Sequence, residues 1–202
     1  MHHLTTLLIA LSTAILPAKL LPYTFPPEFP TSTAYQASID GTAVPALQTK
    51  RGAFLSFGMS APVEIKVRLS QAPQDIVVRP LSSGVVAKID GDRISFVLPR
   101  PMNLSVELDG NLDDPLFIFA NPELAAPDKN DPKVRFYEGG KIHEAGEIHL
   151  TDGETLFLEG GAVVRGLVRA RGSNIAVRGP GILDAGTRTH KINMLVLREC
   201  QQ

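Results

Sequence analysis

The sequence predicts an all-β protein, with an N-terminal antiparallel β-sandwich followed by the first coils of a right-handed parallel β-helix. Three observations support this prediction. Between residues 34 and 122, apolar and charged residues alternate at a period of two, and no helical period occurs. Asp-Gly turns follow or separate these short runs. From residue 133 to 202, short apolar segments recur at a spacing of roughly twenty residues, which is typical of a β-solenoid.

The first residues, 1–18, are interpreted as an export signal. Leu4–Leu16 is mostly apolar but too short to span a bilayer, and Ser12-Thr13-Ala14 offers a cleavage site of small residues. We therefore expect a secreted protein, extracellular or periplasmic, with no membrane segment after cleavage. Residues 19–33 include the proline-rich segment Pro22–Pro30 and are expected to form a stiff, extended linker.

Composition limits the classes of function. The chain has 202 residues, of which 44% are hydrophobic, and a formal net charge of -1. This length and apolar content suit one or two domains with a real core. The balanced charge gives no reason to expect nucleic acid as a partner. The single cysteine, Cys200, cannot form an internal disulfide, and we expect it to pack as a small apolar residue at a strand end.

The predicted sandwich covers residues 34–122. Alternation across Val63–Leu69 places the apolar side chains on one face of a sheet and the charges in water. The dipeptides Asp40-Gly41 and Asp90-Gly91 follow or separate such runs and predict tight hairpins, because glycine accepts a positive φ. Leu116–Ala120 is a continuous apolar run, which predicts a strand covered on both sides. A polar loop, Pro127–Pro132, then marks the expected domain boundary.

The predicted β-helix covers residues 133–202. Leu156–Gly166 aligns with Ile175–Ala185, since each has two apolar strand positions, a charge, a glycine turn and two more apolar residues. A further strand of this series is expected to begin at Met194. A coil of this size cannot bury its apolar face alone, so it must stack on the next. We therefore expect Leu156–Leu158 and Ile175–Val177 to lie parallel in one sheet.

Several of these motifs resemble a known group of enzymes. They are FIFANP at Phe117–Pro122, DGETLFLEGGAVVRG at Asp152–Gly166 and IAVRGPGILDAG at Ile175–Gly186. From about Tyr35 onward, the chain resembles the N-terminal part of secreted parallel β-helix glycoside hydrolases of the polygalacturonase type (family 28) and the dextranase and isopullulanase type (family 49). GPGILDAG is similar to the Gly-x-Gly-x-Ile-Asp-Gly of these families, with Ala185 where glycine is usual.

The resemblance implies hydrolysis of O-glycosidic bonds in a polysaccharide, such as pectin or a glucan, by two carboxylates. The families carry their catalytic motifs in later coils, and none of these motifs occurs in residues 133–202. We therefore predict no catalytic residue and expect the chain to be the N-terminal part of such an enzyme, inactive alone. The alternative is a non-catalytic carbohydrate-binding or structural β module. No metal or cofactor is expected, and a calcium-dependent lyase would need an acidic ligand cluster.

The predicted substrate-binding residues are Arg169 and Arg171. They belong to a local basic cluster with Arg165 and Arg178, and they share a strand face if Leu167–Arg171 is extended. Paired hydrogen bonds from guanidinium groups can hold the acid groups of a polyuronate or a sulfated sugar. The alternative interpretation is an ordinary solvated outer face.

Four other motifs are given structural interpretations. Asp113-Asp114 is expected to be a solvated turn. The segment from His143 to His149 lacks the spacing of a zinc-binding helix, which favours strand-edge histidines. Gly179-Pro180-Gly181 lacks the third glycine of a dinucleotide fingerprint, which favours a tight solenoid corner. Asn103-Leu104-Ser105 is a glycosylation sequon at the start of a strand.

Overall fold

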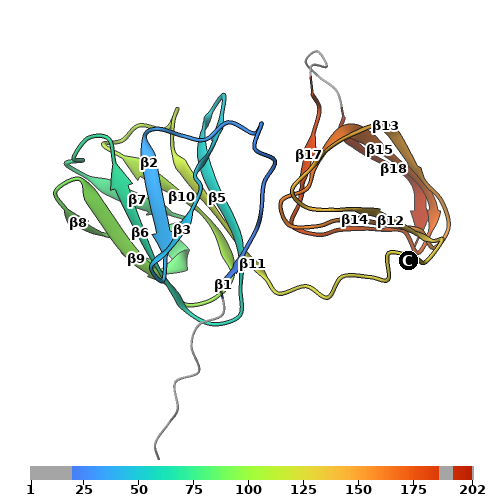
Figure 1. Ribbon diagram of the computed structural model, residues 1–202, viewed down its shortest axis with the longest axis horizontal. Coiled ribbons are helices and arrows are strands. Elements are labelled where there is room, and N and C mark those ends of the chain that lie inside the picture. Colours follow the sequence, from blue (N-terminus) through green and yellow to red (C-terminus); the bar gives the residue numbers. More distant parts are fainter. Residues whose placement is uncertain (1–19, 187–192, 202) are drawn as a thin grey trace, which may run out of the picture.

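The computed structural model describes residues 20–186 and 193–201. These residues form β-strands, with a short 3-10 helix at Leu81–Ser83. Figure 1 shows an antiparallel sandwich beside a stack of parallel coils, joined by an extended loop at residues 123–133. The predicted all-β fold class is confirmed. The expected export signal lies outside the described residues, and within them no helix is long and apolar enough to cross a membrane.

The first sandwich sheet has the strand order β3-β2-β6-β9-β8, with every neighbouring pair antiparallel. Both predicted Asp-Gly hairpins form, since Ile39 lies opposite Thr42 and Asp90 opposite Arg93. The predicted alternation also holds, because every second residue of β6 is buried. The strands of this sheet are β2 (Tyr35–Ile39), β3 (Thr42–Val44), β6 (Val63–Leu69), β8 (Lys88–Asp90) and β9 (Arg93–Leu98).

The second sandwich sheet has the order β1-β5-β11-β10-β7, and β4 also pairs with β5. Its pairs are antiparallel except β5 and β11, which run parallel. The two sheets enclose a large apolar core that includes Ile39, Phe57, Ile65, Leu98 and Ile118. The strands are β1 (Leu20–Pro22), β4 (Leu47–Thr49), β5 (Gly52–Met59), β7 (Ile76–Arg79), β10 (Met102–Leu108) and β11 (Leu116–Pro122).

The expected linker spans residues 19–33, and its described part, residues 20–33, is packed against the sandwich. Leu20–Pro22 is strand β1 and pairs with Phe57–Met59 of β5. The following residues run along the side of the sandwich that faces the coils (Figure 1). We call residues 23–29 the strap. Phe25 and Phe29 of the strap pack on the Phe54 ring, with centroids 6.4 and 6.1 Å away. A proline-rich segment therefore behaves as an additional layer of the sandwich.

The strand predicted to be covered on both sides, Leu116–Ala120, is covered on only one. In β11, Leu116, Ile118 and Ala120 enter the core, whereas the other face carries Phe117 and Phe119 and stays partly exposed. All residues of β5 are buried instead. The core covers one face of β5, and the strap covers Phe54 on the other face. Continuous hydrophobicity in the sequence did not distinguish these two strands.

The coils form two parallel sheets. The first has the order β12-β14-β16, and the second has β13-β15-β17, with β18 also on β15. Leu156 lies opposite Val177 in a parallel pair of one sheet, which confirms the predicted stacking. The interior holds a small apolar core that includes Ile148, Leu156, Val164 and Val168. The strands are β12 (Val134–Tyr137), β13 (Ile142–Leu150), β14 (Thr155–Leu158), β15 (Val163–Ser173), β16 (Ala176–Arg178), β17 (Ile182–Asp184) and β18 (Leu195–Gln201).

The structural register refines the predicted repeat. The sequence alignment matched Leu156 with Ile175, but Leu156 is paired with Val177, a shift of two residues. A shift of two keeps the same side chains inside, which is why the pattern still predicted the stack. Val163 pairs with Ile182, as aligned. The expected further strand, β18, pairs with the second half of β15 and so belongs to the second sheet, not to the Leu156 series.

Two glycines of a coil turn allow the strap to approach closely. A Cβ added at Gly160 would collide with the Tyr23 ring, and one at Gly161 would collide with the backbone of Thr24. Gly161 also has a φ of 87°, which favours glycine. Burial in this contact raises the pKa of Tyr23 to about 12. The Gly160-Gly161 turn is therefore the place where the strap contacts the coils.

Candidate functional site

The outer face of the second coil sheet carries the predicted arginines. Val164, Val168 and Ala170 of β15 point into the coil interior, so Arg165, Arg169 and Arg171 point outward from the same strand. The predicted shared face of Arg169 and Arg171 is present. Arg178 lies on β16 in the other sheet, and the predicted group of four arginines is therefore divided. Their spacing is visible in the sequence, but the turn that separates Arg178 from the other three was not predicted.

Arg165 links three successive coils. Its Nη1 lies 2.8 Å from Glu144 Oε1 on β13, and its Nε lies 3.3 Å from Asp184 Oδ2 on β17. The hydrogen bond to Glu144 is the largest of the effects that raise the pKa of Arg165. Asp184, which the family resemblance assigned to a structural turn, also accepts a hydrogen bond from the Gly186 N–H at 2.9 Å. This ladder of charges supports the stacking of the coils.

Arg169 and Arg171 also have partners within the protein. Arg169 Nη1 donates to the carbonyl oxygens of Val168 and Asn193 at 3.2 and 3.0 Å, and Nη2 lies 3.6 Å from Glu147 Oε1. Arg171 Nη2 lies 2.7 Å from Glu199 Oε2. The Arg169 side chain is 29% exposed and that of Arg171 is 74% exposed. Arg171 is therefore the more accessible of the two, and sugar binding by both stays a prediction.

The carboxylates on this face are arranged for ion pairing. Inverting glycoside hydrolysis needs two carboxyl groups with room for a water molecule between them, and one must keep its proton. Here the Arg165 guanidinium lies between Glu144 and Asp184. The guanidinium therefore pairs with both carboxylates, one on the preceding coil and one on the following coil.

Acidic groups elsewhere have structural partners. Glu107 is buried on β10, and both its oxygens accept hydrogen bonds from Arg79 Nε at 3.0 and 2.9 Å. Asp113 and Asp114 lie in the exposed turn expected for them. The Asp113 N–H donates to Asn111 Oδ1 at 2.9 Å, and the Tyr35 hydroxyl donates to the Asp114 carbonyl at 3.1 Å. None of these groups faces another acid across a groove.

Among the described residues, the two histidines and the cysteine have separate partners. His143 Nε2 is 2.8 Å from the Glu138 carbonyl oxygen, and His149 Nε2 is 3.5 Å from Glu147 Oε2. Both are on β13, a strand, as expected. Cys200 is exposed on β18, where packing as an apolar residue was expected. Across residues 20–186 and 193–201, no group of three or more His, Cys, Asp or Glu residues is placed to hold a metal ion.

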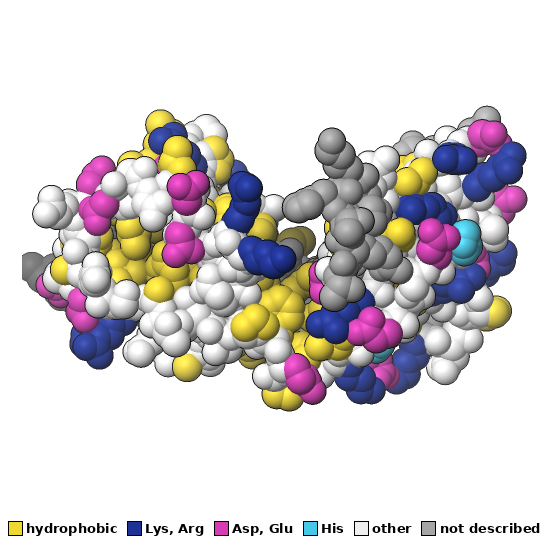
Figure 2. Space-filling model, turned by 90° about the horizontal axis from the view of Figure 1, so that it is seen from above, with side chains coloured by type: hydrophobic (Ala, Val, Ile, Leu, Met, Phe, Trp, Pro, Cys, Tyr) yellow, Lys and Arg dark blue, Asp and Glu magenta, His cyan; other side chains and the backbone are white. Residues whose placement is uncertain are grey.

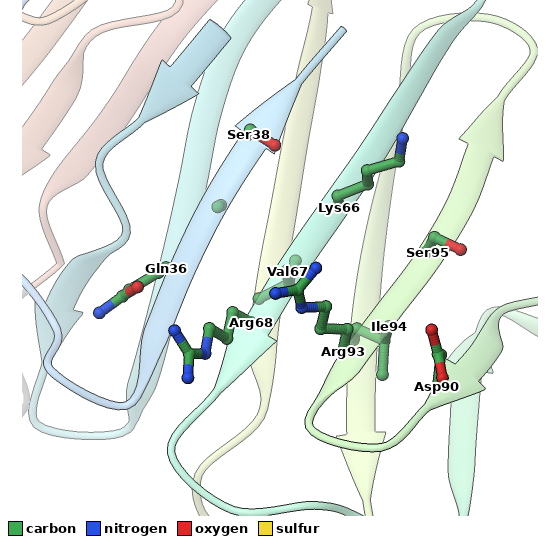
Figure 3. Close-up of a pocket in the computed structure, with 10 residues that line it drawn as sticks. Gln36, Ser38, Lys66, Val67, Arg68, Asp90, Arg93, Ile94 and Ser95 are labelled. Carbon is green, nitrogen blue, oxygen red and sulfur yellow. The ribbon is translucent and has the colours of Figure 1, made fainter. Parts of the chain in front are cut away.

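The outer face of the first sandwich sheet has a shallow hollow of about 480 Å³. Arg68 and Arg93 lie directly opposite each other on β6 and β9, and Figure 3 shows Arg93 reaching toward β6. Such like-charge pairs are unfavourable unless an anion lies between them. Asp92 supplies it, 2.8 Å from Arg68 Nε and 3.9 Å from Arg93 Nε. Its pKa is lowered, chiefly by the hydrogen bond from Arg68. The hollow is thus a solvated, internally neutralised surface.

A cleft of about 830 Å³ lies between the sandwich and the coils. One wall is the outer face of the second sandwich sheet, with Phe54, Phe117 and Phe119, and the opposite wall is the coil turn Gly179–Gly186. In Figure 2, hydrophobic side chains reach the surface where the two parts meet. This cleft was not predicted from the sequence. The available signal was the spacing of Phe117 and Phe119, which places both on the face opposite Leu116 and Ile118.

The arrangement of a sandwich followed by coils was compared with known proteins. No protein-family model matches the chain, and no curated protein matches its sequence. The fold is similar to that of Dex49A from Penicillium minioluteum, with a TM-score of 0.59 and 16% sequence identity. The similarity covers 90% of this chain and 54% of Dex49A, so the chain spans about half the length of that protein. At this identity, the comparison shows a shared fold.

Proposed function

We propose that the chain is the N-terminal part of a secreted glycoside hydrolase of the dextranase type. The enzyme hydrolyses O-glycosidic bonds of a polysaccharide by a two-carboxylate mechanism. The observation that supports this most directly is the fold: an antiparallel sandwich and then parallel coils, similar to the dextranase Dex49A over 90% of the chain. The motif GPGILDAG at Gly179–Gly186, which resembles these families, forms a coil turn with strand β17 and so fits the same assignment.

The charges of the coil face favour a neutral glucan over a polyuronate as the substrate. Arg165, Arg169 and Arg171 each lie within 4 Å of a carboxylate, namely Glu144, Glu147, Asp184 or Glu199. A uronate would have to displace these carboxylates, leaving them unpaired on the same face. A neutral sugar needs only hydrogen bonds, which guanidinium and carboxylate groups both still offer. This interpretation favours the dextranase type over the polygalacturonase type.

The second candidate function is a non-catalytic carbohydrate-binding or structural β module. The position of the Arg165 guanidinium between Glu144 and Asp184 favours it, because that geometry leaves no room for an attacking water. The hydrolase and the carbohydrate-binding module imply polysaccharide binding, whereas a structural module does not. The two candidates differ in whether the chain belongs to an enzyme, whose reacting groups would lie in later coils.

The proposal is tested with affinity electrophoresis of the 202-residue chain in gels that contain dextran, polygalacturonate or no polysaccharide. We expect retardation in dextran and little in polygalacturonate. Equal mobility in all three gels would overturn the assignment to a polysaccharide-acting protein. A reducing-sugar assay on the same substrates should show no release by this chain. Release of new reducing ends would show that its own residues include a catalytic pair, and it would overturn the second candidate.

A further inference from the structure

The cleft between the sandwich and the coils has the mixed lining of a sugar site. Its volume of about 830 Å³ lies within the range usual for small-ligand pockets. Three phenylalanines of the second sandwich sheet, Phe54, Phe117 and Phe119, line one wall. We call them the aromatic strip. Phe117 and Phe119 are nearly parallel, with an interplanar angle of 13° and centroids 6.2 Å apart, and Phe119 meets Phe54 at 5.9 Å.

Polar groups flank the strip in register. Asn103 of β10 lies opposite Phe119 on one side, and Ser56 of β5 lies opposite Phe119 on the other. Both also line the cleft. Neighbours that are directly opposite on adjacent strands are close enough to touch one ligand. An amide supplies donors and an acceptor, and a hydroxyl supplies one of each. An apolar strip with a hydrogen-bonding side chain on each side matches a pyranose, whose C–H faces are apolar and whose rim carries hydroxyls.

The charges of the cleft point to a neutral ligand. Among the described residues that line it, Lys50 is cationic and Asp184 is anionic. Asp184 is already paired with Arg165 across the coils, 3.3 Å away. From these described residues, a polyanionic sugar would meet one lysine and a partly neutralised carboxylate, which is too little charge to select it. Aromatic rings and neutral amides, by contrast, select sugars by shape and hydroxyl position.

We propose that the aromatic strip of the cleft is a non-catalytic binding site for a neutral glucan segment, held against the sandwich beside the coils. The proposal deepens the proposed function and rests on it. The sandwich then contributes to substrate capture in addition to supporting the coils. Bound chain would be presented to the coil face that carries Asp184, because this residue lines the cleft and also belongs to the Arg165 ladder.

The absence of tryptophan from the sequence allows a direct test. Phe119→Trp introduces a single reporter into the strip, and Val97→Trp places the matched control on the exposed face of the other sandwich sheet. The protein is made without N-glycosylation, since Asn103 begins a sequon at the cleft. We expect isomaltotriose to shift the emission of the Phe119→Trp protein in a saturable way and to leave the control unchanged. Trigalacturonate should shift neither. An unchanged Phe119→Trp signal, in a protein whose circular dichroism and melting are native, overturns the proposal.

Alanine variants separate this proposal from the proposed function. Phe117→Ala and Phe119→Ala, both partly exposed, should weaken retardation in dextran gels about tenfold, because each removes a ring from the strip. Leu112→Ala, an exposed apolar residue away from the cleft, is the control and should have no effect. If wild type and both variants bind dextran equally, the cleft site is wrong and the proposed function stands. If wild type binds no polysaccharide, both fail.

Discussion

The two parts of the molecule hold together by different means. The sandwich encloses a wide core between antiparallel sheets, with residues such as Phe57 and Ile118 fully buried. The coils have a much smaller apolar interior, which includes Leu156 and Val168. They also carry ion pairs between successive coils on their outer face, and glycine turns connect their strands. The sandwich can bury its apolar surface alone, whereas each coil depends on its neighbours. We therefore expect the sandwich to be the more stable part of the molecule. The coils should be more sensitive to substitutions in single turns.

The largest expected effect is in the sandwich core. Phe57 is fully buried, so Phe57→Ala should lower the free energy of unfolding by about 3–5 kcal/mol, through lost burial and the cavity left behind. Leu156→Ala in the coils should lower it by about 2–5 kcal/mol. Urea unfolding followed by circular dichroism measures both. Two separate unfolding transitions, with each variant shifting a different one, would support the difference between the sandwich and the coils. A change below about 1 kcal/mol in Phe57→Ala would contradict it.

The next effect is at the docking turn. Gly161→Ala forces a Cβ into the backbone of Thr24 and imposes a positive φ on alanine. The conformational part alone costs about 1–2 kcal/mol. The matched control is Gly153→Ala, where φ is 73° and the added Cβ meets nothing within 4 Å. We expect Gly161→Ala to lose more stability than Gly153→Ala and to expose the strap to limited proteolysis. Equal losses and equal cleavage would show that the strap is not docked there.

A smaller effect concerns Glu154, which joins two coils. Its Oε2 accepts a hydrogen bond from the Thr151 N–H at 2.7 Å, and its Oε1 lies 3.2 Å from Arg135 Nη2. The pKa of Glu154 is lowered, mainly by that Thr151 backbone hydrogen bond. Because the folded pKa lies below the unfolded one, its stabilisation is present above the ordinary value of 4.5 and is lost as the pH falls through the folded pKa.

Glu154→Gln should therefore lower the free energy of unfolding by about 1–2 kcal/mol at neutral pH. The difference from wild type should shrink as the pH is lowered below 4.5, the ordinary value for this carboxyl. Urea unfolding at a series of pH values measures it. A difference that stays constant across this range would mean that the charge of Glu154 does not contribute.

The smallest effect is expected on the outermost charges. Arg171 and Glu199 form an ion pair in which both side chains are more than 70% exposed. Arg171→Gln should change the free energy of unfolding by no more than about 0.5 kcal/mol. It also tests the predicted sugar-binding role of Arg169 and Arg171. Under the neutral-glucan proposal, retardation in dextran stays near that of wild type. A strong loss of polygalacturonate binding in the Arg169→Gln and Arg171→Gln proteins would instead favour the polyuronate interpretation.

Structural features that depend on residues close together in the sequence were predicted correctly. The alternation in Val63–Leu69, the turns at Asp40 and Asp90 and the stacking of Leu156 on the next coil follow from local periods and turn chemistry. A two-residue error in the coil register did no harm, because it preserves which side chains point inward.

Contacts between distant segments were beyond such reasoning. The partners of Arg165 lie one coil before and one coil after it, so Glu144 and Asp184 are found only when the register is known. The parallel pairing of β5 with β11 placed Phe54 beside Phe117 and created the aromatic strip. Tyr23 contacts Gly160, although most of the chain separates these two residues in the sequence. Periodicity indicates which face of a strand is apolar, but it does not say whether core, strap or open cleft covers that face.

The contact between Tyr23 and Gly160 also has a consequence for biosynthesis. Strand β1 can pair with β5 soon after both leave the ribosome, but the docking site for the Tyr23 ring does not exist until Gly160 has been made. At usual rates of translation this delay is on the order of ten seconds. During that interval, the nascent chain presents an uncovered tyrosine beside the growing sandwich. A chaperone that binds the chain early would find its target there.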